Sequence, residues 1–538
     1  MQHQFIQYVY LILAIVALVM VANKLRLATP IVLVIGGLLL SLISSFATIG
    51  IDPEMIFFIF LPPLLYESAW QVSWKQFWKF RRVIASFAFP IVILTSCVVA
   101  YVSVALIPGF TLAMGFLLGG IISPPDAISS TTIMKQANAS KSLIGLTEGE
   151  SLLNDASSLI VFRFAIAAIL TGQFHLQEAS LSFVMVVVFG IAIGVLVGFV
   201  FYAIHKWLAV TSDIDIVLTL LTPYCMYYIA EYFHCSGVLS VVSGGLLLSN
   251  KRQSMLSYAS RIQSVNVWNN IVFVMNGLVF LLIGLQLPSI MQQLGDTTLL
   301  SAIGYGLIIS TVLIVTRIIC TVGASYFTMF MSNFITVADA NPGWKMPLIY
   351  GWAGIRGVVS LAAALSIPLL MNDGQPFPHR NLILFITFIV ILVTLVGQGL
   401  TLPWFIRKFS EESRLPKIPS RRQELIIQKK MAHAVIKHLE EKYNEVWAQN
   451  ELLHGLHSRL NMELRILSKE LEVEDYPEEH ELLNNYQQIY LEVLEQQRSL
   501  LSEMNHMEEF EEDLIRKYLS LIDMEEFKTR EKLLKEAE

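Results

Sequence analysis

The sequence predicts an all-α polytopic membrane protein with about thirteen transmembrane helices and a helical C-terminal domain in the cytoplasm. Of its 538 residues, 55% are hydrophobic and only 15% are charged, a composition too apolar for one soluble domain. Apolar runs long enough to cross ~30 Å of hydrocarbon recur as far as Lys408. After Lys408 charged residues become dense, and apolar residues recur three and four positions apart, which is typical of amphipathic helices.

The membrane spans are located by runs of about 20 apolar residues. The first run has no basic region before it and no small-residue cleavage site after it, so we interpret it as a span rather than a removed signal peptide. The predicted spans lie near residues 5–23, 29–48, 54–70, 83–107, 112–134, 147–171, 181–205, 214–233, 236–250, 267–288, 299–326, 346–371 and 381–406. Spans one to six and eight to thirteen are expected to form two inverted repeats.

Lysines and arginines are concentrated in alternate loops, those that follow the odd-numbered spans. Loops rich in these residues stay in the cytoplasm. We therefore expect a multi-pass protein of the cell membrane with its N-terminus outside and its C-terminus in the cytoplasm. The basic residues of these loops are Lys24, Arg26, Lys75, Lys79, Arg81, Arg82, Lys135, Lys141, Lys206, Lys251, Arg252, Arg261, Lys345, Arg407 and Lys408.

Three regions are expected along the chain: a transmembrane domain over 1–408, a linker over 409–420 that contains two prolines, and a cytoplasmic helical domain over 421–538. Asp475-Tyr476-Pro477 interrupts the helical pattern of the last region, which therefore predicts two to four helices. We expect this region to be regulatory. The net charge of −6 lacks the basic excess of nucleic-acid-binding proteins, so no nucleic-acid partner is expected.

Three charged residues lie in the middle of predicted spans: Asp126, Asp155 and Arg356. At 1.5 Å per residue they lie ~20 Å, ~12 Å and ~15 Å from the ends at which their spans begin, so all three converge on the midplane. A charge at the centre of a bilayer costs about 3 kcal/mol unless it has partners. We therefore interpret the two aspartates as functional residues rather than as isolated structural ones.

Helix-breaking residues lie beside these charges. Pro124 and Pro125 directly precede Asp126, and glycines surround Arg356. Proline removes a backbone donor and crowds the preceding turn, so the fifth span is expected to unwind and to free backbone carbonyls. Interrupted helices at matching positions of two repeats are a good sequence indication of a transport site. The sequence thus predicts two broken, crossing helices.

The residues around the first break fit a site for a monovalent cation or a proton. Ser151 and Asp155 are four residues apart and share one helix face. Together with Asp126 and the carbonyl of Pro125 they offer the hard oxygen ligands that such cations prefer. A buried carboxylate that holds either a proton or a cation can couple the two fluxes. No catalytic residue and no cofactor apart from the transported ions is expected.

Glu150 has two interpretations. Thr147-x-x-Glu150 matches a capping box, so Glu150 could cap the sixth span. The alternative, which we favour, is an ion pair with Arg356, because a buried arginine needs a partner. Arg317 is expected to extend its charged end to the membrane surface. Glu67 is expected to face either a cytoplasmic funnel or a neighbouring helix.

Four short motifs in this order resemble those of the sodium/proton exchanger type of monovalent cation:proton antiporter, similar to the bacterial NhaP proteins. The resemblance covers about residues 5–408 and does not extend to the C-terminal region. The motifs are Leu61-Pro62-Pro63 with Glu67, Pro125-Asp126, Gly149-Glu150-Ser151 with Asn154-Asp155, and Gly354-Ile355-Arg356-Gly357.

The resemblance implies exchange of Na⁺ or Li⁺ for H⁺ by an elevator-type mechanism, in a homodimer with a mobile core domain and a dimerisation domain. Asp155 would be the main carboxylate for the cation and the proton, completed by Asp126, Ser151 and the backbone of Pro125. Asn154 would stabilise the unwound part of the fifth span. An Asn-Asp pair in place of Asp-Asp resembles the electroneutral branch of the family. Pro125 departs from the family pattern, since several relatives have a hydroxyl residue there.

Three alternatives remain at this stage. A K⁺/H⁺ exchanger would use the same ligands, because selectivity depends on the dimensions of the cavity. A gated cation channel would need rings of carbonyls or acidic residues, and no filter-like repeat is present. An intramembrane enzyme would need a nucleophile and base or a His-Glu-x-x-His motif, and the membrane part of the sequence contains neither.

Overall fold

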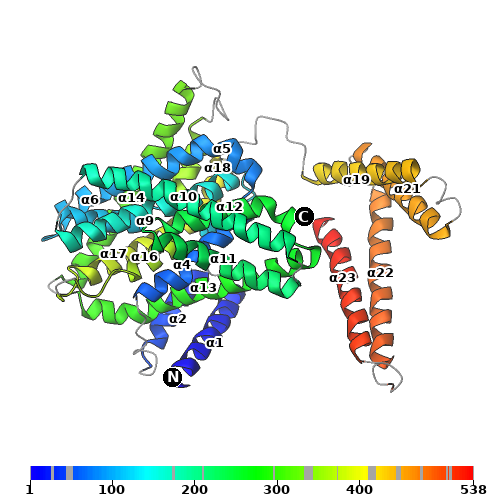
Figure 1. The fold of residues 1–538 in the computed structure, drawn as a ribbon, viewed down its shortest axis with the longest axis horizontal. Coiled ribbons are helices and arrows are strands. Elements are labelled where there is room, and N and C mark those ends of the chain that lie inside the picture. Colours follow the sequence, from blue (N-terminus) through cyan, green and yellow to red (C-terminus); the bar gives the residue numbers. More distant parts are fainter. Residues whose placement is uncertain are drawn as a thin grey trace. The chain divides into compact units, whose positions relative to one another are not determined.

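The structure is a computed structural model, and its described part consists of two compact units, Met1–Glu412 and Ser413–Glu538. Apart from one isolated β-bridge between Leu370 and Pro376, the regular structure of this part is helical (Figure 1). The described residues are 2–25, 29–43, 53–172, 176–208, 211–294, 297–331, 343–371, 374–409, 420–443, 450–472, 477–504, 507 and 512–536.

Each predicted span contains a helix or a pair of helices of the first unit. By length and composition, six of the described helices are able to cross a membrane, and three shorter helices are apolar. The helices are α1 (Gln2–Leu25), α2 (Thr29–Leu40), α4 (Pro53–Gln71), α5 (Trp74–Ser86), α6 (Val92–Leu106), α7 (Leu112–Ile122), α8 (Ala127–Gln136), α9 (Lys141–Thr171), α10 (Leu176–Trp207), α11 (Ser212–Tyr232), α12 (Gly237–Met255), α13 (Tyr258–Gln292), α14 (Leu299–Met331), α15 (Lys345–Trp352), α16 (Val358–Leu365), α17 (Arg380–Val393) and α18 (Gly399–Phe409).

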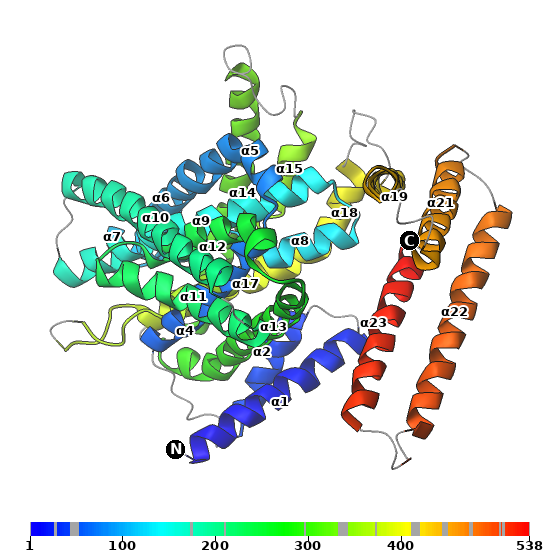
Figure 2. The same ribbon diagram turned by 45° about the vertical axis from the view of Figure 1, so that its right-hand side comes forward.

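The helices of the first unit pack mainly within two groups. One group contains α1, α2, α4 and α10–α13, and the other contains α5–α9 and α14–α18. Helix α9 is central to the second group, since it packs against α5, α6, α7 and α8 and also reaches α4 and α12 of the first group (Figure 2). Helix α9 therefore connects the two groups of helices.

The chain leaves helical geometry at both predicted breaks. Helix α7 ends at Ile122 and α8 begins at Ala127, with the two prolines between them. Helix α15 ends at Trp352 and α16 begins at Val358, with Gly354 and Gly357 in the gap. Proline lacks the donor that would continue α7, and glycine weakens a helix interior, so both breaks have a local cause.

Two predicted boundaries were wrong. The basic segment before the fourth span is not a loop but helix α5, which continues through a π-helical turn at Phe87–Ile91 into α6. Residues 74–86 contain no glycine or proline to end a helix, and the π-helical turn accommodates Pro90.

Helix α9 begins at Lys141, earlier than predicted, because Ser140 caps it by accepting a hydrogen bond from the Leu143 amide at 3.3 Å. Thr147 lies inside the helix and donates to the carbonyl of Leu143 at 2.9 Å. The capping-box interpretation of Thr147 and Glu150 is therefore wrong.

The second unit has four helices in its described part: α19 (Ser420–Lys442), α21 (Glu451–Glu472), α22 (Pro477–Met504) and α23 (Glu512–Glu536). Helix α19 packs on α21, and α22 packs on α23. Helix α22 begins with Pro477, the position at which the sequence interrupts the pattern, and proline is well suited to a first helical position. Of the predicted linker, residues 410–419 lie outside the described residues.

Candidate ion-binding site

The break between α7 and α8 is bridged by a side chain from α9. The hydroxyl of Ser151 donates to the carbonyl of Pro125 at 3.2 Å and accepts from the amide of Ala127 at 3.1 Å. Both backbone groups lack helical partners because the helix is broken here. The structure thus brings together Ser151 and the Pro125 carbonyl beside Asp126, three of the predicted ligand positions.

Asp126 is held by two helix ends. Its carboxylate accepts from the amide of Ser129 at 3.3 Å and from the Ser129 hydroxyl at 2.6 Å, which caps the start of α8. Its own amide donates to the carbonyl of Ile355 in the second break at 2.7 Å. A Cβ atom at Gly357 would collide with the Asp126 carboxylate, so glycine is needed for the carboxylate to approach the N-terminus of α16. Negative charge is favoured at that end of a helix.

Asp155 lies on α9, one turn beyond Ser151, and is only 8% exposed. At 1.5 Å per residue it lies about 21 Å along α9 from Lys141, further from the start of the helix than the sequence predicted, because the helix begins earlier. Within the described residues its carboxylate has no hydrogen bond or ion pair. The carboxylates of Asp126 and Glu150 are close enough to repel its charge. A buried carboxylate with negative neighbours and no protein donor is well suited to bind a proton or a cation.

Arg356 is completely buried and binds backbone rather than a carboxylate. Its guanidinium donates to the carbonyls of Ile122 at 2.8 Å and Ser123 at 3.1 Å, and also to that of Gly354. The first two carbonyls belong to the C-terminal end of α7, where positive charge is favoured. Arg356 therefore satisfies carbonyls that the break leaves without amide partners.

The predicted ion pair between Glu150 and Arg356 was wrong, as was the surface position of Arg317. Glu150 accepts two hydrogen bonds from Arg317 on α14, at 3.1 and 2.9 Å, and a third from the hydroxyl of Tyr350 on α15. Arg317 is only 3% exposed. Glu150 lies on the face of α9 that meets α14 and α15, while the broken backbone directs Arg356 to α7. The buried arginine that needs a carboxylate is thus Arg317.

Asn154, which was expected to stabilise the unwound part of the fifth span, forms no side-chain hydrogen bond to it among the described residues. Its side chain is completely buried, and neither of its amide atoms has a hydrogen-bond partner among the described residues. No hydrogen bond in the described part of the structure therefore supports the stabilising role that the family resemblance implies for Asn154.

Two cavities reach the break from different sides. The larger, of about 190 Å³, is lined by Ser151 and by Glu67, Lys135 and Glu148. The last two form an ion pair at 3.2 Å. Glu67 thus lines a cavity, which agrees with one part of its expected placement; the side of the membrane on which this cavity opens belongs to the proposed function.

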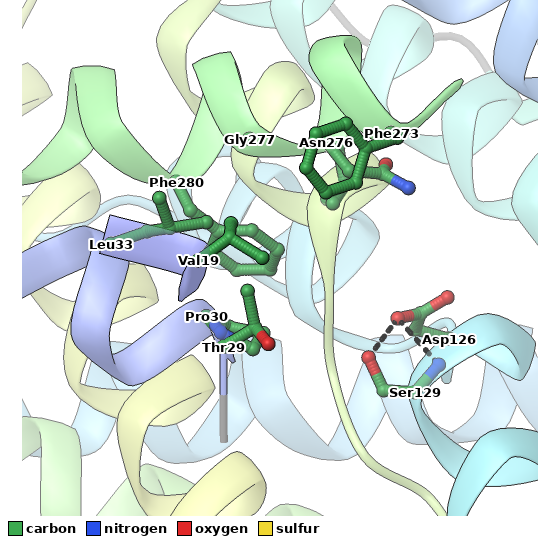
Figure 3. A pocket seen from close by; sticks show the side chains of 11 residues that line it. Val19, Thr29, Pro30, Leu33, Asp126, Ser129, Phe273, Asn276, Gly277 and Phe280 are labelled. Carbon is green, nitrogen blue, oxygen red and sulfur yellow. Dashed lines mark hydrogen bonds between the residues drawn. The ribbon is translucent and has the colours of Figure 1, made fainter. Parts of the chain in front are cut away.

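The second cavity, of about 160 Å³, exposes Asp126. Asp126 and Ser129 lie on one side of it, and apolar side chains such as Val19, Leu33 and Phe280 lie on another (Figure 3).

Sequence reasoning missed Asn276 on α13, which lines the cavity that exposes Asp126. Its side-chain oxygen is buried and has no hydrogen-bond partner among the described residues. Asn276 is the one side-chain amide in the apolar stretch 271–285 of a predicted span, and this signal could have identified it. Because only charged residues within the spans were considered, Asn276 was not identified.

The chain is similar to known cation/proton antiporters. The transmembrane sodium/hydrogen exchanger family matches residues 10–408. A sodium, potassium, lithium and rubidium/H⁺ antiporter of Bacillus pumilus is 32% identical over 476 residues, which form 86% of this chain and 69% of that protein. The Bacillus subtilis protein of the same name is 33% identical over 411 residues, which form 73% of this chain and only 60% of that protein.

The fold is also that of a solved structure. The sodium proton antiporter MjNhaP1 from Methanocaldococcus jannaschii superimposes with a TM-score of 0.60 at 17% sequence identity. The superposition covers 76% of this chain and 100% of that chain.

Proposed function

This chain belongs to the sodium/hydrogen exchanger family of secondary transporters, and on that basis we propose that it exchanges Na⁺ or Li⁺ for H⁺ across the cell membrane. The family membership excludes the enzyme alternative, because these proteins are antiporters. The observation that supports our proposal most strongly is the buried carboxylate of Asp155, which has no hydrogen bond or ion pair among the described residues. It lies one turn from the Ser151 hydroxyl and the freed carbonyl of Pro125.

The proposed coupling follows from competition at Asp155. A cation needs the ionised carboxylate, so a proton on Asp155 and a cation beside it exclude each other. Asp126, Ser151 and the Pro125 carbonyl add oxygen ligands to the cation. Asn154 carries no titratable charge, so a single carboxylate changes its protonation state in each cycle. Exchange of one cation for one proton moves no net charge.

Alternating access is proposed to occur by an elevator-type movement between the two groups of helices. The group of α5–α9 and α14–α18 contains the site and both breaks, so it would form the mobile core domain. The group of α1, α2, α4 and α10–α13 would form the dimerisation domain of a homodimer.

The larger cavity opens beside Lys135 and Glu148. With thirteen spans in two inverted repeats and the N-terminus outside, this opening would face the cytoplasm.

A K⁺/H⁺ exchanger is the second candidate. The two Bacillus relatives are named for transport of potassium and rubidium as well as sodium and lithium. The ligands at the break are oxygens that also suit larger alkali cations. We therefore expect Na⁺ and Li⁺ to be preferred and K⁺ to be the alternative substrate.

The two main regions of the chain are proposed to have separate functions. Residues 1–408 would carry out transport, and the helices within 421–538 would form a cytoplasmic regulatory domain joined to it by the linker 409–420. The matched family ends at residue 408, and the division into compact units falls shortly after it.

The test is proton flux in proteoliposomes under an imposed pH gradient, with Na⁺, Li⁺ and K⁺ added in turn and with or without a clamped membrane potential. Asp155→Asn should abolish cation-dependent flux. Asp213→Asn, at an exposed aspartate at the start of α11, is the matched control and should retain it. Wild-type flux should not respond to the potential. Retained flux in Asp155→Asn, or flux that follows the potential, would contradict the proposed site or its stoichiometry.

A further inference from the structure

Helix α5 presents an unusual surface of exposed cations and aromatic rings. Its sequence, WKQFWKFRRVIAS, contains four basic residues and no acidic residue. Lys75, Lys79, Arg81 and Arg82 are all exposed. Trp74 and Trp78 are 38% and 55% exposed, and their rings stack with centroids 5.8 Å apart.

The cations lie close to the aromatic rings. The guanidinium of Arg81 lies 4.7 Å from the centroid of the Trp78 ring and donates to the Trp78 carbonyl at 2.7 Å. The ammonium of Lys79 lies 5.1 Å from the centroid of the Phe80 ring. Cations held against aromatic rings form a surface that is apolar and positively charged at once.

The opposite side of α5 is fixed against α9. Phe77 and Ile84 pack against Gly149, where a Cβ atom would lie 3.3 Å and 2.6 Å from their side chains. This close approach fixes one side of α5 against the protein and leaves its cations and Trp78 exposed.

The length of the helix places this surface at the edge of the membrane. The continuous helix from Trp74 to Leu106 has 33 residues. At 1.5 Å per residue this is about 50 Å, more than the ~30 Å of hydrocarbon. The apolar part at Val92–Leu106 must occupy the hydrocarbon, so α5 extends into the headgroup region. Tryptophan is enriched at this depth.

We propose that α5 is a binding site for the headgroups of acidic phospholipids. The cations would bind the lipid phosphates, and the tryptophans would pack between the upper parts of the acyl chains. Charge complementarity supports this partner, since four cations with no acidic residue on the same helix suit an anionic surface. Clusters of four or more basic residues next to a transmembrane helix or on an amphipathic helix are typical of such sites.

The test measures quenching of Trp78 by brominated lipids in full-length protein reconstituted in vesicles. Brominated phosphatidylglycerol in phosphatidylcholine is compared with brominated phosphatidylcholine in phosphatidylglycerol, at equal fractions of brominated lipid. The signal of Trp78 is the difference between wild type and Trp78→Phe, since the chain has nine tryptophans. We expect at least twofold stronger quenching by the acidic lipid, and loss of this difference in 0.5 M KCl.

Three sets of variants test whether the preference depends on these cations. The triple variant Lys75→Gln, Lys79→Gln and Arg81→Gln should quench equally with both lipids. The exchanges Lys75→Arg, Lys79→Arg and Arg81→Lys keep the charge and should keep the preference, which controls for misfolding. The control triple Lys206→Gln, Lys251→Gln and Lys408→Gln removes exposed cations elsewhere and should also keep it. Equal quenching in wild type, or an undiminished preference in the α5 glutamine variant, would overturn the proposal.

Discussion

Glu150 and Arg317 show how a buried charge near the site is neutralised. The two residues lie on different helices and form a two-point ion pair with side chains 0% and 3% exposed. Removal of one partner from such a pair leaves an uncompensated charge in a nonpolar environment. The pair should therefore contribute to stability without contacting the transported ions.

Arg317→Met should lower the free energy of unfolding by about 3–5 kcal/mol, because Glu150 is left buried without its cation. Thermal unfolding in detergent measures the loss as a fall in melting temperature. Arg407→Met, at an exposed arginine of α18, is the control and should leave the melting temperature unchanged.

The double variant Arg317→Met with Glu150→Gln should recover part of the loss, whereas Arg356→Ala with Glu150→Gln should be close to additive. Rescue of Arg356→Ala by Glu150→Gln would show that the pair predicted from the sequence is the real one.

At this scale the sequence predicted that Ser151 meets the broken segment at Pro125 and Asp126, and it failed for the partners of Glu150 and Arg356. The spacing of Ser151 and Asp155 places both on one face, and the prolines place the Pro125 carbonyl beside Asp126. The partner of Glu150 is 167 residues away along the chain. The choice of partner depends on how the chain brings Arg317 of α14 to Glu150 of α9, which no local pattern encodes.

The two broken helices form the central element of the site, and each break supplies a charge to the other. Arg356 from the second break binds carbonyls at the C-terminal end of α7, and Asp126 from the first lies against Gly357 at the start of α16. The positive charge of Arg356 thus lies at the C-terminal end of α7, and the negative charge of Asp126 lies at the N-terminal end of α16. Each charge is favoured by the dipole of the helix that it meets. The contact between the breaks should tolerate very little additional volume.

Gly357→Ala should abolish transport and lower the melting temperature, because its methyl group would occupy the position of the Asp126 carboxylate. Initial exchange rates and thermal unfolding of the same preparation measure both effects. Gly304→Ala is the matched control, since nothing lies within 4 Å of a Cβ at that position on α14. A normal exchange rate in Gly357→Ala would show that the contact does not hold the site.

The pair of α22 and α23 in the second unit should loosen in acid. Arg498 on α22 donates to Asp523 and Glu526 on α23, at 2.7 and 2.6 Å, and Arg498 and Arg530 hold the pKa of Glu526 below its usual value of 4.5. Because the pKa is lowered on folding, this stabilisation is present above about pH 4.5 and is lost as the pH falls through the folded pKa.

Hydrogen exchange of α22 and α23 should therefore accelerate between pH 5 and pH 3 after correction for the intrinsic rate. Arg498→Gln should show fast exchange already at neutral pH and little further change in acid. Equal acid sensitivity in the variant and wild type would show that Arg498 is not the cause.

Elements were predicted well where a strong local signal exists. The two breaks follow from Pro124-Pro125 and from the glycines around Arg356. The failures concern α5 and the start of α9. The segment that forms α5 was predicted to be a loop because its basic residues were assumed to mark the end of a membrane span. No residue in that segment ends a helix. Ser140 caps α9 about two turns before Thr147, the predicted start of the sixth span.

At the scale of the whole molecule, the candidate ion-binding site and the C-terminal region belong to different compact units. The all-helical class followed from composition and from the lengths of the apolar runs. The grouping of the helices could not be read from the sequence, because it depends on contacts between segments far apart. The packing of α9 against both groups places the site where relative movement of the groups would change its access.

Truncation after residue 410 should leave a membrane-inserted protein that exchanges cations for protons, since the matched family ends at residue 408. The pH at which exchange is half-maximal should shift, because the removed helices are proposed to be regulatory. Exchange in proteoliposomes across a range of pH measures both properties. A folded, inserted and inactive protein at every pH would show that the second unit is required for transport itself.

The central claim is that one cation and one proton compete for Asp155. Its most direct test is the KM for Na⁺ at a series of pH values, from initial exchange rates in proteoliposomes. Competition at one carboxylate predicts that the apparent KM rises about tenfold for each unit of pH on the acid side, while the maximal rate at saturating Na⁺ stays constant. A maximal rate that falls in acid while the KM stays constant would contradict the claim, because the proton would then act at a site other than the one that binds the cation.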